Sequence, residues 1–277
     1  MPELPEVETV RRGLESHIRG ARILRVEVRR PDLRVPFPPR FAQRLVGRRV
    51  DEVARRAKYL LLHLDDGQIL VIHLGMSGRL IVGPARRNAA PGRHEHVEFE
   101  FDNRQGVVFE DHRRFGLMTL VPGTEIDRHA LFRHLGIEPL DSAFDGTALA
   151  RLLAGARTPI KAALLDQKRV VGVGNIYACE ALFRAGISPR RLARTVVAAR
   201  AERLAVAIRS VLTEAIAAGG SSLRDYVQAS GELGYFQHAW KVYGREGEKC
   251  AHAGCTGRIR RIVQANRSTF HCPRCQA

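Results

Sequence analysis

The first ten residues of the chain, Met1 to Val10, contain a group that could act as a nucleophile. Proline at position 2 is small enough for the initiator methionine to be removed, which would leave the imino nitrogen of Pro2 as the amino terminus. An α-amino group titrates at about 7.7–8.0, against about 10.4 for lysine, so far more of it is unprotonated at neutral pH. Its attack on a sugar C1′ or an aldehyde gives a cationic iminium, which acts as an electron sink. Glu3 beside it could donate a proton and later take one back.

The same residues also fit an ordinary helix start. Acidic residues in a first turn suit the helix dipole, and Gly20 is a suitable stop. Apolar residues recur at steps of three and four and predict an amphipathic helix from Pro5 to about Arg19: Val7, Val10, Leu14 and Ile18. Spacing alone favours this plain interpretation over the chemical one.

Four of the five cysteines lie in the last 28 residues, as Cys250-x4-Cys255 and Cys272-x2-Cys275. Two such pairs are typical of a tetrahedral zinc site, and metal binding would supply the folding energy of so small a segment. Disulfides are disfavoured because nothing in the sequence suggests secretion. His252, between the first two cysteines, leaves open whether it replaces one of them. The fifth, Cys179, is expected to be a buried hydrophobic residue.

Two further motifs could bind phosphate. Glycines in Gly172-Val173-Gly174 precede a predicted helix that Asn175 can cap, so free N–H groups could approach an anion there, although such motifs are often simply tight turns. Lys58 comes directly before a predicted apolar strand. Its charge is therefore expected either to face a cleft that could bind phosphate or to lie at an exposed strand end.

The charge balance of the chain favours a polyanionic partner. Its 277 residues include 45 Lys and Arg against 29 Asp and Glu, a net charge of +16 and a pI near 10.7. Nucleic acid ranks ahead of an anionic membrane because no basic amphipathic anchor stands out, while ribosomal association or genome bias are the alternatives. No apolar run is long enough to span a bilayer and no signal peptide is recognisable, so we expect a soluble intracellular protein.

Hydrophobic patterning predicts an α+β protein. Short alternating segments predict an antiparallel β-sandwich or barrel closed by the N-terminal helix, with strands at 23–28, 50–53, 59–64, 69–74, 79–82, 97–101, 107–110 and 117–121. Helical periodicity follows near 128–135, 146–154, 159–168, 175–185, 198–217 and 221–229, before a short basic hairpin. The expected domains are 1–125, 126–236 and 237–277.

The motif Met-Pro-Glu-Leu-Pro-Glu-Val-Glu-Thr, with the residues that follow along the whole chain, resembles the formamidopyrimidine-DNA glycosylase family of base-excision repair enzymes. The resemblance implies a bifunctional glycosylase and AP lyase in which Pro2 is the nucleophile and Glu3 the general acid/base. Lys58 would contact phosphate and assist catalysis. One structural Zn²⁺ is implied, with no nucleotide or redox cofactor. The implied partner is double-stranded DNA with oxidised bases or abasic sites, bound by a monomer in the bacterial cytoplasm, at the nucleoid.

The resemblance also implies DNA contacts. His73, Lys161 and Asn175 match phosphate or lesion contacts, Asn175 in a helix–two-turns–helix, and Arg267 matches the tip arginine of a zinc finger. Such an enzyme must take its target base out of the stack, and Met76, Arg113 and Phe115 match the residues inserted in its place. Without the resemblance, His73 would be structural and Met76 and Phe115 would be core residues. For Arg267, one of four arginines that form a basic surface on the hairpin, the alternative is a solvated charged loop.

Two departures from the family pattern and two alternatives remain. His112 stands where the family usually has proline, and the first cysteine pair is wider than the usual two-residue spacing. A sister enzyme of endonuclease VIII type prefers oxidised pyrimidines, but it typically has glycine at the fourth position, where this chain has Leu4. A non-catalytic zinc-dependent DNA-binding protein is disfavoured by the intact Pro2-Glu3 pair. The loop between Ser221 and Phe236 is expected to tune lesion preference.

Overall fold

The computed structural model describes residues 2–86, 90–222 and 227–277 and divides the chain into two compact units. The first contains residues up to Arg133 together with Ala218–Gln237, and the second contains His134–Ala217 and His238–Ala277. The predicted division into three domains at 125 and 236 stays a prediction. Among the described residues, every helix is too short or too polar to cross a bilayer.

The first unit contains the predicted N-terminal helix, α1 (Leu4–Ile18). The four apolar residues at helical spacing, Val7, Val10, Leu14 and Ile18, are each only 1% exposed, so this stripe faces the core as predicted. Gly20 follows the helix at φ +80°, a left-handed conformation that glycine adopts at little cost. The helix therefore begins close to the amino terminus and holds it against the core.

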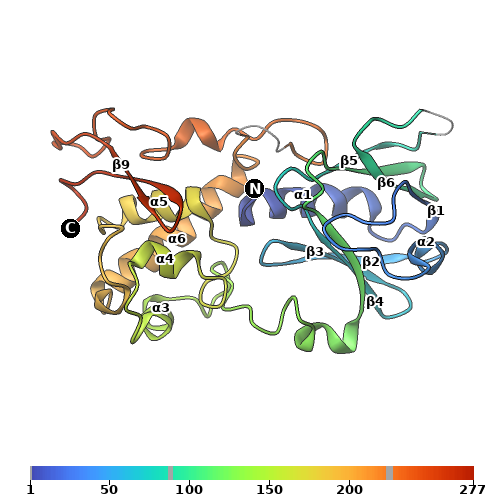
Figure 1. The fold of residues 1–277 in the computed structure, drawn as a ribbon, viewed down its shortest axis with the longest axis horizontal. Helices are drawn as coiled ribbons and strands as arrows, with labels where there is room; N and C mark the ends of the chain where they lie inside the picture. Colours follow the sequence, from blue (N-terminus) through green and yellow to red (C-terminus); the bar gives the residue numbers. More distant parts are fainter. Residues whose placement is uncertain (1, 87–89, 223–226) are drawn as a thin grey trace. The chain divides into compact units, whose positions relative to one another are not determined.

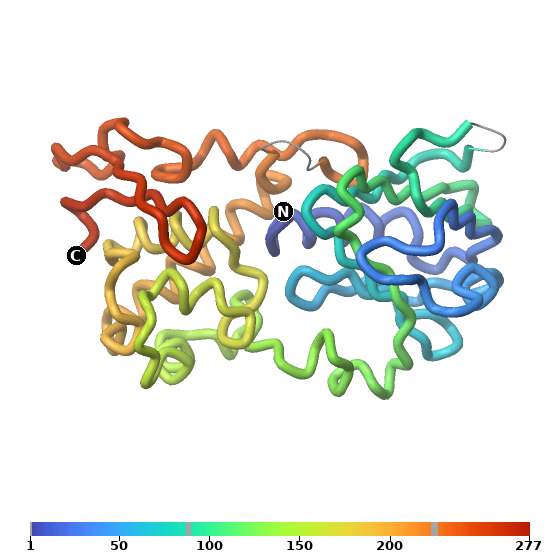
Figure 2. Tube along the Cα trace, viewed as in Figure 1, coloured from blue at the N-terminus to red at the C-terminus, as the bar shows by residue number. Residues whose placement is uncertain are grey.

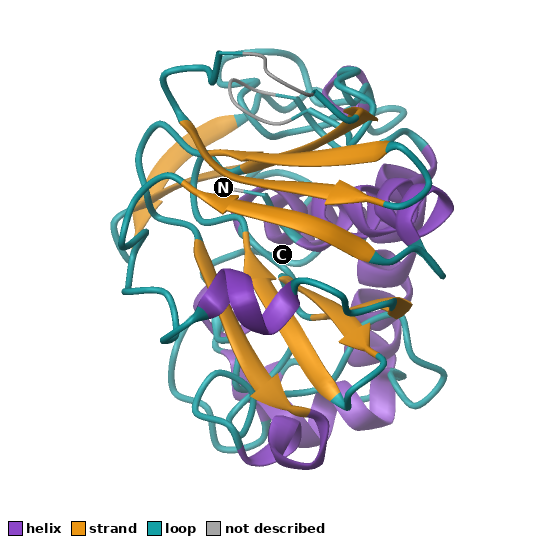
Figure 3. Ribbon diagram, turned by 90° about the vertical axis from the view of Figure 1, so that its right-hand side faces the viewer, coloured by secondary structure: helices purple, strands orange, loops and turns teal. Residues whose placement is uncertain are grey.

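Two antiparallel four-stranded sheets complete the first unit, and Figure 3 shows their strands in orange. One sheet has the order β1-β6-β7-β5, formed by Ile23–Val28, Glu95–Phe101, Gln105–Glu110 and Arg79–Pro84. The other has the order β2-β3-β4-β8, formed by Val50–Arg56, Tyr59–Leu64, Gln68–His73 and Leu117–Pro122. The eight strands confirm the predicted antiparallel sheets, with ends that differ by a few residues at most.

Two short elements in this unit differ from the predictions. A five-residue helix, α2 (Phe41–Leu45), was not predicted, because one turn gives no periodic signal. The helix predicted near 128–135 is wrong: a 3₁₀ helix covers Gly123–Arg128 and turns follow it. Phe132 in those turns packs edge-on against Tyr59, with ring centroids 5.1 Å apart.

Residues 218–237 also belong to the first unit. The Val82 N–H donates to the Ala229 carbonyl at 2.8 Å, and Ser221 forms an isolated bridge with Tyr235. A Cβ at Gly13 of α1 would lie 2.7 Å from the Ala229 methyl, so glycine lets this segment approach the helix closely. The helix predicted at 221–229 falls partly on residues 223–226, which lie outside the described residues.

The second unit contains four α-helices among the described residues, α3 (Gly146–Leu153), α4 (Ile160–Leu165), α5 (Asn175–Arg184) and α6 (Ala199–Ala217), and a 3₁₀ helix at Ala193–Thr195. A two-stranded hairpin follows, β9 (Arg260–Gln264) and β10 (Arg267–His271). The ribbon in Figure 1 and the tube in Figure 2 show this C-terminal hairpin, in red, beside α5. The prediction of helices followed by a hairpin is confirmed.

Candidate functional site

The predicted nucleophile and its neighbour lie at the buried start of α1. Pro2 is buried, and Glu3, the residue that caps the helix, is 4% exposed. The carboxylate of Glu6 reaches back and accepts a hydrogen bond from the Glu3 backbone N–H at 2.8 Å. The first two residues of a mature chain beginning at Pro2 are therefore held by the helix rather than left to fray.

Glu6 also ties this start to the segment 218–237. It is 2% exposed, and its second carboxylate oxygen accepts a hydrogen bond from the Ser221 N–H at 2.8 Å. Its position in the first turn predicted only a favourable interaction with the helix dipole. The bond to Ser221 joins residues 215 positions apart, so no local pattern could have indicated it.

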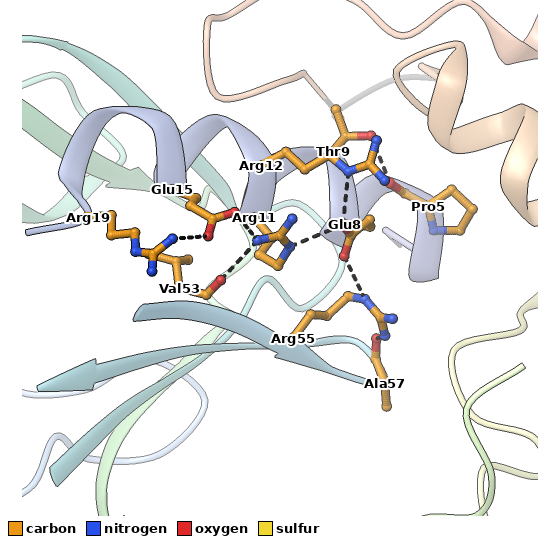
Figure 4. Close-up of polar contacts among 10 residues, drawn as sticks. All are labelled: Pro5, Glu8, Thr9, Arg11, Arg12, Glu15, Arg19, Val53, Arg55 and Ala57. Atoms are coloured by element: carbon orange, nitrogen blue, oxygen red, sulfur yellow. Dashed lines mark hydrogen bonds and ion pairs between the residues drawn. The ribbon is translucent and has the colours of Figure 1, made fainter. Parts of the chain in front are cut away.

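A second carboxylate of α1, that of Glu8, joins the helix to the end of β2, as Figure 4 shows for Glu8, Arg55 and Ala57. The Arg55 guanidinium donates to Glu8 Oε2 at 3.1 Å and to the Ala57 carbonyl at 2.9 Å. Burial would raise the pKa of Glu8, but Arg11, Arg12 and Arg55 outweigh it, so the pKa is lowered and the carboxylate stays ionised. Glu8 thus links the helix to the β2–β3 turn.

Lys58 lies in that turn and not in the strand itself. Arg56 pairs with Tyr59, so Ala57 and Lys58 form a tight turn, with Ala57 at φ +54°. Lys58 is 7% exposed, which places its side chain inside the unit rather than at an exposed strand end. Its positive charge is, after burial, one of the causes that lower the pKa of His73.

His73, at the end of β4, is held in its neutral form. Burial, with the positive charges of Lys58 and Arg34, lowers its pKa from 6.5 to about 4. The Gly75 N–H donates to His73 Nδ1 at 2.9 Å, so the proton of the neutral ring lies on Nε2. His73 can therefore offer an Nε2–H donor to an anion without carrying a charge.

Replacing His73 with asparagine should make the protein less sensitive to acid. The unfolded chain binds a proton at His73 below about pH 6.5, whereas the folded chain does so only below about pH 4, so stability falls as the pH drops through this window. Asparagine can still accept from the Gly75 N–H. We expect the wild type to lose about 2 kcal/mol more than His73→Asn between pH 7 and pH 4.5 in urea unfolding. An equal loss of stability in the two proteins would contradict this prediction. The substitution His238→Asn, at an exposed histidine, is the control.

The three residues of the predicted wedge lie on two loops of the first unit. Met76, between β4 and β5, is half-buried, whereas Arg113 and Phe115, between β7 and β8, are exposed, Phe115 by 45%. The Arg113 guanidinium lies 4.8 Å from the centroid of the Phe115 ring. His112 is exposed, and its ring lies 6.1 Å from that of His94.

In the second unit, the glycine motif forms the predicted turn before α5. Gly172 has φ +78°, and the Gln167 side chain holds the turn by accepting from the Gly172 N–H and donating to the Val173 carbonyl. The predicted cap is wrong: Gly174 is the capping residue, and Asn175 is the first residue of the helix. The Asn175 side chain instead donates to the Ser268 carbonyl at 2.9 Å, so it contacts the hairpin.

Lys161 points to the same place in the hairpin. It is 1% exposed, and its ammonium donates to the Ser268 carbonyl at 3.1 Å and the Thr269 hydroxyl at 2.6 Å. Ser268 directly follows Arg267, the exposed first residue of β10. Lys161 and Asn175 therefore both hold the strand residue next to the predicted tip arginine, while their predicted contacts with DNA stay predictions.

We expect Lys161→Met to destabilise the second unit. The substitution leaves the Ser268 carbonyl and the buried Thr269 hydroxyl without the ammonium donor, at a cost of about 2 kcal/mol. Thermal unfolding should show a lowered melting temperature while the zinc content stays at one ion per chain. The substitution Lys168→Met, at an exposed lysine, is the control. The prediction fails if the two variants have the same melting temperature.

The four C-terminal cysteines form the predicted metal cluster. Their sulfur atoms all lie within 4.8 Å of one another, with Cys255 and Cys275 at 2.9 Å, Cys250 and Cys275 at 3.5 Å, and Cys255 and Cys272 at 3.8 Å. A tetrahedron with Zn–S bonds of about 2.3 Å has edges of about 3.8 Å, so the four thiolates fit one zinc ion. The ion would hold the ends of the finger together.

His252 is not part of this cluster. Its ring stacks on Phe183 of α5, with centroids 4.2 Å apart and an angle of 13° between the planes. The lengthened Cys250-x4-Cys255 turn therefore leaves the four-cysteine ligand set intact and supplies a packing contact with α5. Gly257 is required nearby, since a Cβ there would lie 2.7 Å from the Cys272 sulfur.

The predicted site residues thus fall into two groups. Those in the first unit are Pro2, Glu3, Lys58, His73, Met76, Arg113 and Phe115, and those in the second are Lys161, Asn175, Arg267 and the four cysteines. The fold and these groups define a class of protein: a strongly basic zinc-finger protein in which Pro2, an imino acid, lies at the buried start of a helix.

Comparison with known proteins identifies the family. Three family models match in order: the formamidopyrimidine-DNA glycosylase N-terminal domain at residues 1–118, its H2TH domain at 135–227, and the zinc finger found in FPG and IleRS at 247–277. Formamidopyrimidine-DNA glycosylases of Rhodospirillum centenum and Cereibacter sphaeroides are 60% and 58% identical, each over all of both chains. The chain belongs to the formamidopyrimidine-DNA glycosylase family.

Solved structures support the same assignment. The MutM (Fpg) protein of Thermus thermophilus is 42% identical and matches with a TM-score of 0.86, covering 99% of this chain and 98% of that one. The Fpg of Lactococcus lactis in complex with DNA containing an abasic site is 34% identical, with a TM-score of 0.88 and 99% of each chain covered. The predicted fold and family are confirmed.

Proposed function

We propose that this protein is a bifunctional DNA glycosylase and AP lyase that removes oxidised purines, 8-oxoguanine and formamidopyrimidines, from duplex DNA. The observation that carries the proposal is the Pro2-Glu3 pair at the buried start of α1, in a chain of this family. A secondary amine there can form a covalent intermediate with deoxyribose, which a DNA-binding protein without activity would not need.

The proposed reaction begins at the Pro2 nitrogen. Its lone pair forms a bond to C1′, the base leaves with the electrons of the glycosidic bond, and the proton lost from the Pro2 nitrogen is transferred to the departing base. Glu3 donates a proton to the ring oxygen as the sugar opens, which leaves a cationic iminium between Pro2 and C1′. Loss of a C2′ proton then expels the 3′ phosphate, and a second elimination expels the 5′ phosphate.

Basic residues of both units are proposed to bind the phosphates. Lys58 is buried in the β2–β3 turn, which Arg55 links to Glu8 of α1, and neutral His73 can donate from Nε2. Each is proposed to stabilise an anion near the reacting sugar. Arg267, Asn175 and Lys161 are the proposed contacts of the second unit. With a net charge of +16, binding should weaken steeply as salt rises. We propose that the enzyme acts as a monomer on chromosomal DNA at the nucleoid.

Oxidised pyrimidines are a second candidate substrate class. The wild-type Lactococcus lactis Fpg, 34% identical to this chain, has been crystallised with DNA containing an oxidised pyrimidine. Leu4, where enzymes of endonuclease VIII type typically have glycine, favours purines.

Single-turnover excision from a panel of matched duplexes tests the proposal. The duplexes carry 8-oxoguanine, a formamidopyrimidine, an oxidised pyrimidine, an abasic site or no lesion. We expect the two oxidised purines to be removed fastest, with strand cleavage that leaves phosphates on both sides of the gap. Faster removal of the pyrimidine would assign the endonuclease VIII type of activity. Binding without cleavage of any duplex would make the protein a non-catalytic binder.

A further inference from the structure

Two loops of the first unit cross from one sheet to the other, side by side. Residues 74–78 connect β4 to β5, and residues 111–116 connect β7 to β8. At one end His73 pairs with Leu117, and at the other Arg79 pairs with Glu110. Both loops therefore begin and end on hydrogen-bonded neighbours. Together they carry all three residues of the predicted wedge.

Asp111 joins these loops through both oxygens of a fully buried carboxylate. The residue is 0% exposed. Its Oδ1 accepts from the Ser77 hydroxyl at 2.5 Å and lies 3.3 Å from the Arg113 N–H, while Oδ2 accepts from the Gly116 N–H at 2.7 Å. The Arg113 N–H also lies 3.3 Å from the Ser77 hydroxyl oxygen. One side chain thus contacts the residue after Met76 and the backbone on both sides of Phe115.

The backbone of Asp111 is itself fixed. Its N–H donates to the His94 carbonyl at 3.0 Å, and its carbonyl accepts from His96 Nε2 at 2.8 Å. His96 is buried at 7% exposure, in strand β6. The carboxylate therefore projects from an anchored position and not from a loop free to move with its partners.

The two loops also touch through their backbones. Gly75 has φ +65°, and a Cβ there would lie 2.3 Å from the carbonyl carbon of Phe115. A Cβ at Gly116 would lie 2.5 Å from the Phe109 ring. The approach at Gly75 leaves no room for either loop to move toward the other.

We propose that Asp111 is a positioning residue that holds Met76, Arg113 and Phe115 as one rigid wedge. The proposal rests on the proposed function and on the predicted insertion of these three residues into the duplex as the damaged base leaves. When a preorganised wedge inserts, no free energy is lost in ordering the two loops. More of the free energy gained from the contacts with DNA is therefore available to offset the unstacking of the bases. Asp111 touches no reacting atom in this role.

Asp111→Asn and Ser77→Ala test the proposal. Asparagine keeps the size but has one acceptor oxygen, so its NH₂ group must face either the Gly116 N–H or the Ser77 and Arg113 donors. Ser77→Ala removes the bond to the first loop and leaves the Gly116 bond in place. Arg79→Gln is the control, because it breaks the 4.0 Å ion pair with Glu110 at the base of the same loops.

Hydrogen exchange of the DNA-free protein gives the first readout. We expect Asp111→Asn to speed amide exchange in residues 74–78 and 111–116 together, and Ser77→Ala to speed it mainly in 74–78. Arg79→Gln should change neither. Faster exchange in 111–116 alone in Asp111→Asn would overturn the coupling of the loops, and this readout needs no enzymatic activity.

Activity on two DNA substrates gives the second readout. Asp111→Asn should excise 8-oxoguanine from duplex DNA about 10-fold more slowly than the wild type, while cleavage at a preformed abasic site stays within about threefold. A 2-aminopurine next to the lesion should report equally slower unstacking. An equal loss on both substrates, or unchanged unstacking, would overturn the proposal. If the wild type itself cleaves no substrate, the proposed function fails, and hydrogen exchange still decides whether Asp111 couples the loops.

Discussion

A chain that carries an additional residue ahead of Pro2 should form no covalent adduct with damaged DNA under borohydride. The extra residue converts the imino nitrogen into a tertiary amide, whose lone pair is delocalised and cannot attack C1′. Removing the nucleophile should lower single-turnover excision and strand cleavage by about 10³-fold or more. Trapping on an 8-oxoguanine duplex, resolved on a denaturing gel, measures the loss directly.

The same additional residue placed after Ala277 provides the control, because it changes the mass of the chain equally and leaves the amine free. Binding to an uncleavable abasic-site analogue should stay within about threefold of the wild type in both proteins, since the phosphate contacts remain. Strand cleavage at the wild-type rate by the N-terminally extended chain would contradict the proposed mechanism.

Loss of a zinc ligand should have the second largest effect. Cys272 is fully buried, and its sulfur lies 3.8 Å from that of Cys255 in the cluster of four. Structural zinc supplies about 10–16 kcal/mol to small finger domains, so Cys272→Ser should unfold the hairpin that carries Arg267. We expect zinc content to fall well below one ion per chain and affinity for lesion DNA to fall by about 10²-fold.

Cys179→Ala is a matched control for the zinc ligand. Cys179 is also fully buried and packs in the same apolar cluster as Cys272, but it is not among the four metal-ligating cysteines. This variant should keep one zinc ion and near wild-type affinity. A zinc-free Cys272→Ser variant that binds lesion DNA normally would show that the finger does not contribute to binding.

Local sequence patterns predicted the elements that carry the site. The apolar stripe of Val7, Val10, Leu14 and Ile18 predicted α1, and alternation of apolar and polar residues predicted the strands. In both cases one face of the element is buried, so apolar residues recur with the period of a helix or of a strand. The cysteine spacing predicted the metal cluster in the same way. Short elements such as α2 were not predicted, because a single helical turn contains no repeating pattern of apolar residues.

The contacts that fix the site could not be predicted, because they join residues far apart in the chain. Glu6 reaches Ser221 and Lys161 reaches Thr269, across 215 and 108 positions. No local pattern marked Asp111, and only the register of four strands places its loop beside Ser77. His252 was a possible ligand by spacing alone, and its stack on Phe183 depends on where α5 lies.

Peptide mapping of the reduced covalent complex tests the central claim most directly. The wild-type protein is reacted with an 8-oxoguanine duplex in borohydride, the adduct is digested, and the modified peptide is sequenced by mass spectrometry. We predict that the deoxyribose remnant is attached to the nitrogen of Pro2, at the terminus of a chain that lacks Met1. An adduct on Lys58, or full activity in material that retains Met1, would contradict the account.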